Sequence, residues 1–210
     1  MKKLKEKKVK LIDKIRYYSI SRGHSPAPSF EEYKMEIKML KKQADKRNGL
    51  LHKSIFASRS YMIFSYNDMD IKVGFRLVEV RDEEFRHETC VKVKFNLATS
   101  IKLRIYLKDI TFFKSYELGM KKFEIGSKVF NNKFIVKSNE ESFAINFIKE
   151  DIIDKLLYLE EKLFYPLIKI NKKDLLLVFQ NRLYSEEEYD ELINFTIILL
   201  DRLQLLGHIN

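Results

Sequence analysis

The sequence predicts an α+β fold with basic N-terminal helices, a central antiparallel sheet and a C-terminal strand, helix, hairpin and helix. Apolar residues recur at helical spacing before residue 49 and alternate with charged residues from 61 to 107. Hydrophobic residues make up 45% of the 210 positions, which is enough for one core. We therefore predict a basic helix and linker over residues 1–29 and a single α+β domain over residues 30–210.

The N-terminal part is predicted to hold two helices. Residues 3–20 place one apolar stripe on a strongly basic helix, and residues 21–29 contain a glycine and two prolines that favour a linker. Ser29 is expected to cap a second helix, with Glu32 completing a capping box. The Asn48-Gly49 pair is expected to end that helix.

The middle of the chain is predicted to be strands with one solvated face. Residues 61–66 are β-prone, Asn67-Asp68 reads as a turn, and the strand that follows changes parity near Leu77, which indicates a bulge. Residues 91–97 and 101–107 alternate apolar with polar side chains. Such alternation is typical of antiparallel strands with one face on a core.

The C-terminal part is organised around residues 123–148. Asn131 and Asn132 suggest a turn, and Phe134 and Val136 are expected to face the core from one strand. A helix over residues 140–162, a hairpin and a last helix capped by Ser185 are predicted to follow. The last helix is apolar almost all round, which predicts burial between layers or in an oligomer.

Residues 123–206 carry a loose pattern of glycine, phenylalanine and asparagine followed by Phe-x-Val-x-Ser, matched by Gly126, Phe130, Asn131, Phe134, Val136 and Ser138. This segment resembles the C-terminal part of a family of uncharacterised, often membrane-anchored prokaryotic proteins. The resemblance implies the order of the C-terminal elements, and it implies no activity.

Charge is distributed unevenly along the chain. Residues 1–60 hold 17 Lys and Arg against 6 Asp and Glu, whereas residues 138–210 hold 8 against 14. A basic front half favours an anionic partner, either nucleic acid phosphates or an acidic membrane surface. Abundant Lys, Asn, Ile and Phe also suit a compositional bias. The predicted anion-binding residues are Lys7, Lys8, Lys10, Lys14, Lys38, Lys41, Lys42, Lys72, Arg76, Lys92, Lys94, Lys102 and Arg104.

These patterns favour a non-enzymatic, cytoplasmic binding or accessory protein with no cofactor or metal, which is peripheral to the membrane if its partner is an acidic lipid surface. The lone Cys90 fits a reducing compartment, and the histidines show no metal-ligand spacing. Two alternatives remain open. One is a scaffold or interaction subunit that acts through its apolar last helix, as a homo- or hetero-oligomer. The other is a metal-dependent nuclease using Asp68, Asp70 and Lys72 with Glu32 and Glu36.

Overall fold

The computed structural model describes residues 30–53, 60–79, 85–95, 99–108, 119–180 and 183–209. The side chains of residues 30, 76–79 and 85–87 are not described. The predicted N-terminal helix and linker, with Lys7, Lys8, Lys10 and Lys14, therefore lie outside the described residues, as does Ser29 with its predicted cap.

The described strands form one antiparallel sheet of nine strands in the order β1-β2-β3-β4-β9-β8-β5-β7-β6. The hairpin of β8 and β9 is inserted at its centre, between β4 and β5, although it lies more than fifty residues later in the chain than either. The strands are β1 (Leu50–His52), β2 (Tyr61–Tyr66), β3 (Met69–Glu79), β4 (Phe85–Lys94), β5 (Leu103–Leu107), β6 (Lys121–Phe123), β7 (Phe134–Ser138), β8 (Pro166–Asn171) and β9 (Asp174–Phe179).

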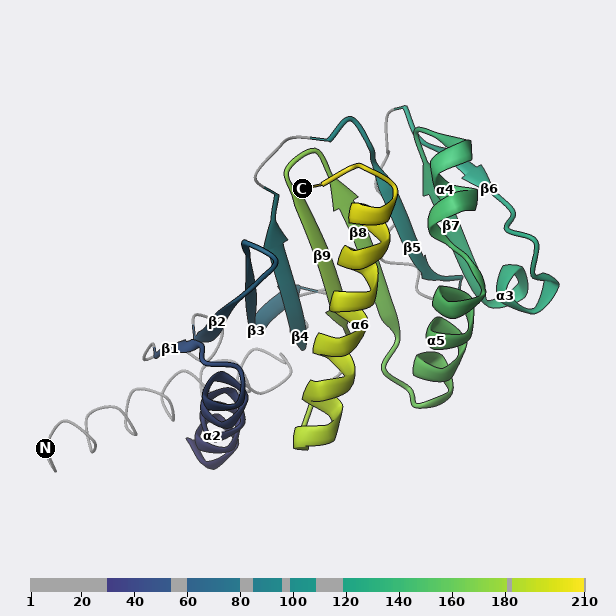
Figure 1. Cartoon of the computed structure of the whole chain (residues 1–210). Coiled ribbons are helices and arrows are strands. Elements are labelled where there is room, and N and C mark those ends of the chain that lie inside the picture. Colours follow the sequence, from purple (N-terminus) through teal and green to yellow (C-terminus); the bar gives the residue numbers. More distant parts are fainter. Residues whose placement is uncertain are drawn as a thin grey trace, which may run out of the picture.

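The helices that the structure describes lie on one face of this sheet (Figure 1). They are α2 (Phe30–Lys46), α3 (Lys128–Lys133), α4 (Glu141–Phe147), α5 (Glu150–Glu161) and α6 (Glu186–Leu205). Helix α6 crosses the centre of the sheet, with α2 on one side of it and α5 on the other. The wide apolar surface of α6 is thus buried within one chain, because the helix has the sheet below it and a helix on each side.

One core joins the helices to the sheet, and the predicted α+β class is confirmed. Phe134 and Val136 of β7 are 2% and 1% exposed, and they share this core with Phe147 and Phe195. The capping box predicted for the last helix is present: Ser185 Oγ accepts from the backbone N–H of Glu188, whose side chain accepts from the Ser185 N–H.

Three local predictions are wrong. The helix expected over residues 140–162 is two helices, because the backbone leaves helical geometry at Ile148 and Lys149. Asn131 and Asn132 lie inside α3 rather than in a turn, and the Asn131 side chain is used to hold the backbone of Ile125. The register between β3 and β4 runs from Ile71 to Glu79 without a bulge.

The face of the sheet away from these helices, here called the reverse face, is less solvated than predicted. Tyr106, Leu167 and Val178 point to this side and form a second buried cluster. Leu176 and Val178 alternate with core residues in β9, so this strand is apolar on both sides. A strand of that kind is typical of a sheet covered on both faces.

Candidate anion-binding face

Six cations stand in one row across the reverse face of the sheet. Starting from the β6 edge, the row crosses seven adjacent strands, and a leucine of β9 takes the one position without a charge. We call this set the basic row, and its members are Lys122, Lys137, Arg104, Lys169, Lys92 and Lys72.

The register of the strands fixes this row. Lys137 pairs directly with Lys122 on one side and with Arg104 on the other. Arg104 pairs in turn with Lys169. Beyond the β9 position, Lys92 pairs with Lys72. Neighbouring strands lie about 4.8 Å apart, so directly paired cations are close neighbours.

Contacts within the protein hold parts of the row. Lys92 Nζ lies 2.9 Å from a carboxylate oxygen of Asp174, and Lys72 Nζ lies 3.5 Å from the centre of the Tyr61 ring. Arg104, Lys137 and Lys169 are half-buried and have contacts of their own. The two ends of the row are the exposed parts, with Lys122 at one end and Lys72 and Lys92 at the other.

The row lies between two bands of different chemistry. On one side of it the side chains are polar, and they include Lys94 and Asp174 of β4 and β9 and Lys102 just before β5. On the other side lies the apolar cluster around Val178. Like charges that directly oppose each other in a sheet are destabilising, so stability alone does not favour this arrangement.

The structure brings together only part of the predicted set. Lys72, Lys92, Lys94, Lys102 and Arg104 share the reverse face, as their alternation predicted. Arg76 lies in β3 opposite Glu88, and its side chain is not described.

The predicted α2 lysines are apart from this face. Lys38, Lys41 and Lys42 are exposed on α2, which packs on the helix side of the sheet (Figure 1). Lys38 and Lys41 face solvent along the helix, and Lys41 forms an ion pair with Asp45 one turn later.

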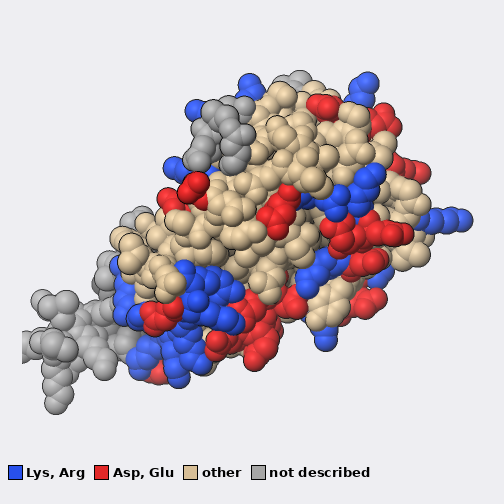
Figure 2. Space-filling model, viewed as in Figure 1, with Lys and Arg blue, Asp and Glu red and all other residues tan. Residues whose placement is uncertain are grey.

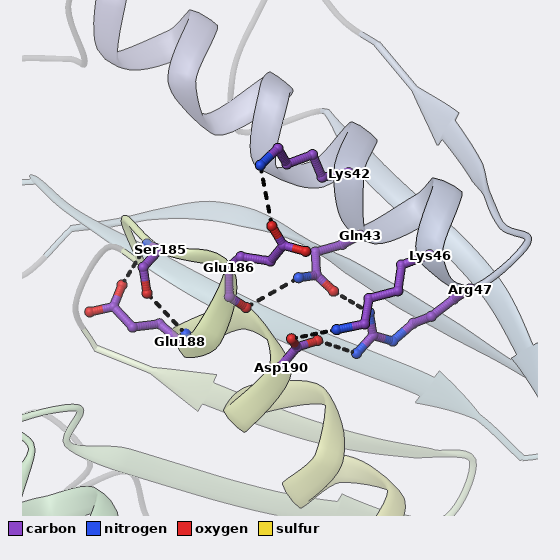
Figure 3. Close-up of polar contacts among 8 residues, drawn as sticks. All are labelled: Lys42, Gln43, Lys46, Arg47, Ser185, Glu186, Glu188 and Asp190. Carbon is purple, nitrogen blue, oxygen red and sulfur yellow. Dashed lines mark hydrogen bonds and ion pairs between the residues drawn. The ribbon is translucent and has the colours of Figure 1, made fainter.

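Much of the basic surface of α2 is neutralised by the acidic start of α6. Figure 2 shows Lys and Arg side chains gathered over α2 directly beside Asp and Glu side chains of α6. Lys42 Nζ lies 3.2 Å from Glu186 Oε2, and Gln43 donates to the Glu186 carbonyl oxygen at 3.2 Å (Figure 3). The uneven charge of the two halves of the sequence is therefore partly cancelled inside the fold.

Asp190 is the centre of this contact. It accepts from Lys46 Nζ at 2.7 Å and from Arg47 Nη2 at 2.6 Å (Figure 3). Burial alone would raise the pKa of Asp190, but the hydrogen bonds and charges of Arg47 and Lys46 outweigh it and lower that pKa. The carboxylate is thus held ionised between two cations.

The residues of the nuclease alternative are not brought together. Asp70 lies on the reverse face, where it accepts from Ser65 Oγ at 3.1 Å, and Asp68 lies in the turn before it. Glu32 and Glu36 instead line a small hollow beside Leu183 on the helix side. Across the described ranges, no three His, Cys, Asp or Glu side chains are grouped in a way that could hold a metal ion.

Sequence reasoning missed half of the row, namely Lys122, Lys137 and Lys169. Lys137 was recognisable as a residue that faces away from the core, because it alternates with Val136. Its place beside Arg104 depends on the pairing of β5 with β7, and the place of Lys169 depends on the pairing of β5 with β8. No local pattern encodes that order of strands.

Comparison with known proteins finds a similar fold in one solved structure. No family model and no curated protein matches this chain. A solved structure has the same arrangement over most of its length, with a TM-score of 0.55, and the match covers 79% of this chain and 93% of that one. It is the mycobacterial trehalose monomycolate transport factor A, TtfA, and it is 10% identical in sequence. At that identity the likeness shows the fold alone.

Among the described helices, none combines the length and apolar character needed to cross a bilayer.

Proposed function

We propose that this protein is a non-enzymatic accessory protein that binds an anionic partner through the reverse face of its sheet. The observation that carries the proposal is the basic row, which lines up six cations across seven strands. Nucleic acid and acidic lipid are the two partner classes that its chemistry fits. We place this binding in the cytoplasm, at or near a membrane surface if lipid is the partner.

Electrostatics favour the reverse face over α2. The lysines of α2 lie beside the acidic start of α6, and Lys42, Lys46 and Arg47 already form ion pairs there. The strand residues of the reverse face carry few acids, chiefly Asp70, Glu88 and Asp174. An approaching anion thus meets a larger excess of positive charge on the reverse face.

The likeness to TtfA supports no particular partner, because the two chains are 10% identical. Vesicles are included in the test below because acidic lipid headgroups are one of the two anion classes that fit the row. The scaffold alternative was based on the apolar surface of the last helix. Because α2, α5 and the sheet cover that surface of α6, it no longer supports this alternative.

Three variants with the same loss of charge test the proposal. The first replaces Lys72, Lys92 and Lys122 of the row by Gln, and the second replaces Lys38, Lys41 and Lys42 of α2. The third is the control and replaces Lys128, Lys149 and Lys162, which are exposed on α3 and beside α5. Binding to duplex DNA, single-stranded RNA and phosphatidylserine vesicles is measured for each at low salt.

We expect the row variant to lose most of the affinity for whichever probe binds, and the control variant to keep it. The affinity of the α2 variant should be close to that of the control variant. Equal losses in all three variants would show that only net charge matters, and absence of binding to all probes would refute the proposal.

A further inference from the structure

Resting on the proposed function, we infer that the anionic partner is a single-stranded nucleic acid that runs along the basic row, across the strands. Three features of the reverse face point to a flexible chain of phosphates. They are the length of the row, the twist of the sheet that carries it, and an aromatic stack at one end.

The row is long and narrow. It spans seven strands and hence six gaps of about 4.8 Å, which gives a length of about 29 Å. Four of its members form one run of direct cross-strand pairs, Lys92 and Lys72 form a second pair, and Leu176 of β9 separates the two. A linear series of cations fits a linear series of phosphates better than a single isolated anion.

The twist of the sheet turns the side chains of the row progressively around its long axis. Adjacent strands rotate by about 20–25°, so six steps turn the side-chain direction by roughly 120–150° from one end to the other. Figure 1 shows that the strand direction changes along the sheet, since β2, the neighbour of β3, slants away from the direction of β8 and β9. Lys122 and Lys72 thus face very different directions.

Only a flexible partner contacts both ends of such a row. A bilayer is flat on this scale, and duplex DNA has a persistence length of about 50 nm, so each meets a fraction of the cations without bending. A single strand bends freely and follows the twisted face from end to end. It therefore reaches more of the six charges than either alternative.

The end of the row near the β1 edge carries stacked rings. His52 and Tyr61 pair across β1 and β2 with ring centres 4.7 Å apart, and Lys72 lies over the Tyr61 ring. Gly74 lies opposite Tyr61, where a Cβ atom would come within 3.0 Å of the Tyr61 Cβ. His52 is exposed, so a base can extend this stack next to the last cation of the row.

The test uses the full chain and a series of oligouridylates of increasing length, followed by fluorescence anisotropy. At a charge spacing of about 3.4 Å along one strand, the row corresponds to about nine nucleotides at most, so affinity should climb steeply up to that length and slowly beyond. Duplex DNA of equal phosphate number and phosphatidylserine vesicles are measured beside it. We expect the single strand to bind at least tenfold more tightly than the duplex.

Two variants separate this inference from the proposed function. His52→Ala should weaken oligouridylate binding several-fold and leave vesicle binding unchanged, whereas the triple variant of Lys72, Lys92 and Lys122 should weaken every probe. If duplex or vesicles bind as tightly as the single strand and still depend on the row, the inference is wrong and the proposed function stands. If no probe depends on the row, both are wrong.

Discussion

Replacing Phe134 by Ala tests the strand register on which both faces of the sheet depend. The Phe134 ring is 2% exposed and stacks on Phe130 with ring centres 4.9 Å apart. Truncating a buried Phe costs about 3–5 kcal/mol, from lost transfer free energy and the cavity left behind. With a urea m-value of about 2 kcal/mol/M, the unfolding midpoint should fall by roughly 1.5–2.5 M. A loss of about 3–5 kcal/mol is a large share of the roughly 5–15 kcal/mol by which a typical domain is stable.

The matched control is Lys137→Ala, three residues along the same strand and on the reverse face. It removes a half-buried cation that directly opposes Arg104 and Lys122. Relief of like-charge repulsion offsets the lost packing of its stem, so the free energy of unfolding should change by about 0.5 kcal/mol or less. Equal midpoints for the two variants in urea would contradict the register and the basic row with it.

Two further predictions concern polar side chains of α6. Asp190→Asn should cost about 1 kcal/mol at neutral pH by removing the charge that Lys46 and Arg47 share. Because folding lowers the pKa of Asp190 below the ordinary value of about 3.9, this contribution is present above about pH 4 and is lost as the pH falls through the folded pKa. Urea unfolding at several pH values should show that the difference in free energy of unfolding between the wild type and Asp190→Asn shrinks in acid. A difference that stays constant with pH would contradict this prediction. Tyr189→Phe should leave stability unchanged or raise it by up to about 1 kcal/mol, because the Tyr189 hydroxyl is buried without a hydrogen-bond partner in the described structure; a loss above 1 kcal/mol by thermal unfolding would reveal a partner.

The elements that sequence predicted well are those specified by neighbours in the chain. The capping box of Ser185 and Glu188 and the hairpin of β8 and β9 both depend on contacts only a few residues apart. The alternation around Val91 and Val93 was equally readable, because each buried residue has a charged neighbour that reports the opposite face.

The features that could not be predicted from the sequence depend on contacts between residues far apart in the chain. The basic row requires β9 to lie beside β4 and β5 beside both β7 and β8, and such pairings span up to about ninety residues. The neutralisation of Lys46 by Asp190 likewise joins residues 144 apart. The break between α4 and α5 was also missed, because Ile148 and Lys149 include neither glycine nor proline to mark it.

The apolar band of the reverse face did leave a signal in the sequence. Residues 175–179 read Leu-Leu-Leu-Val-Phe without any polar residue between them. Such a run is typical of a strand with both faces covered, whereas the flanking strands alternate. This run therefore indicates that the reverse face is less solvated around β9 than the alternation of the other strands predicts.

The salt dependence of oligouridylate binding tests the central claim most directly. For a single strand, the slope of log Kobs against log salt is about −0.7 per phosphate neutralised, so the three exposed cations alone predict a slope near −2 and all six a slope near −4. The variant lacking Lys72, Lys92 and Lys122 should give a slope closer to zero by about 2, because three contacts are lost. The control variant of Lys128, Lys149 and Lys162 should keep the original slope. A wild-type slope near zero, or a row variant whose slope equals that of the control, would contradict binding along the row.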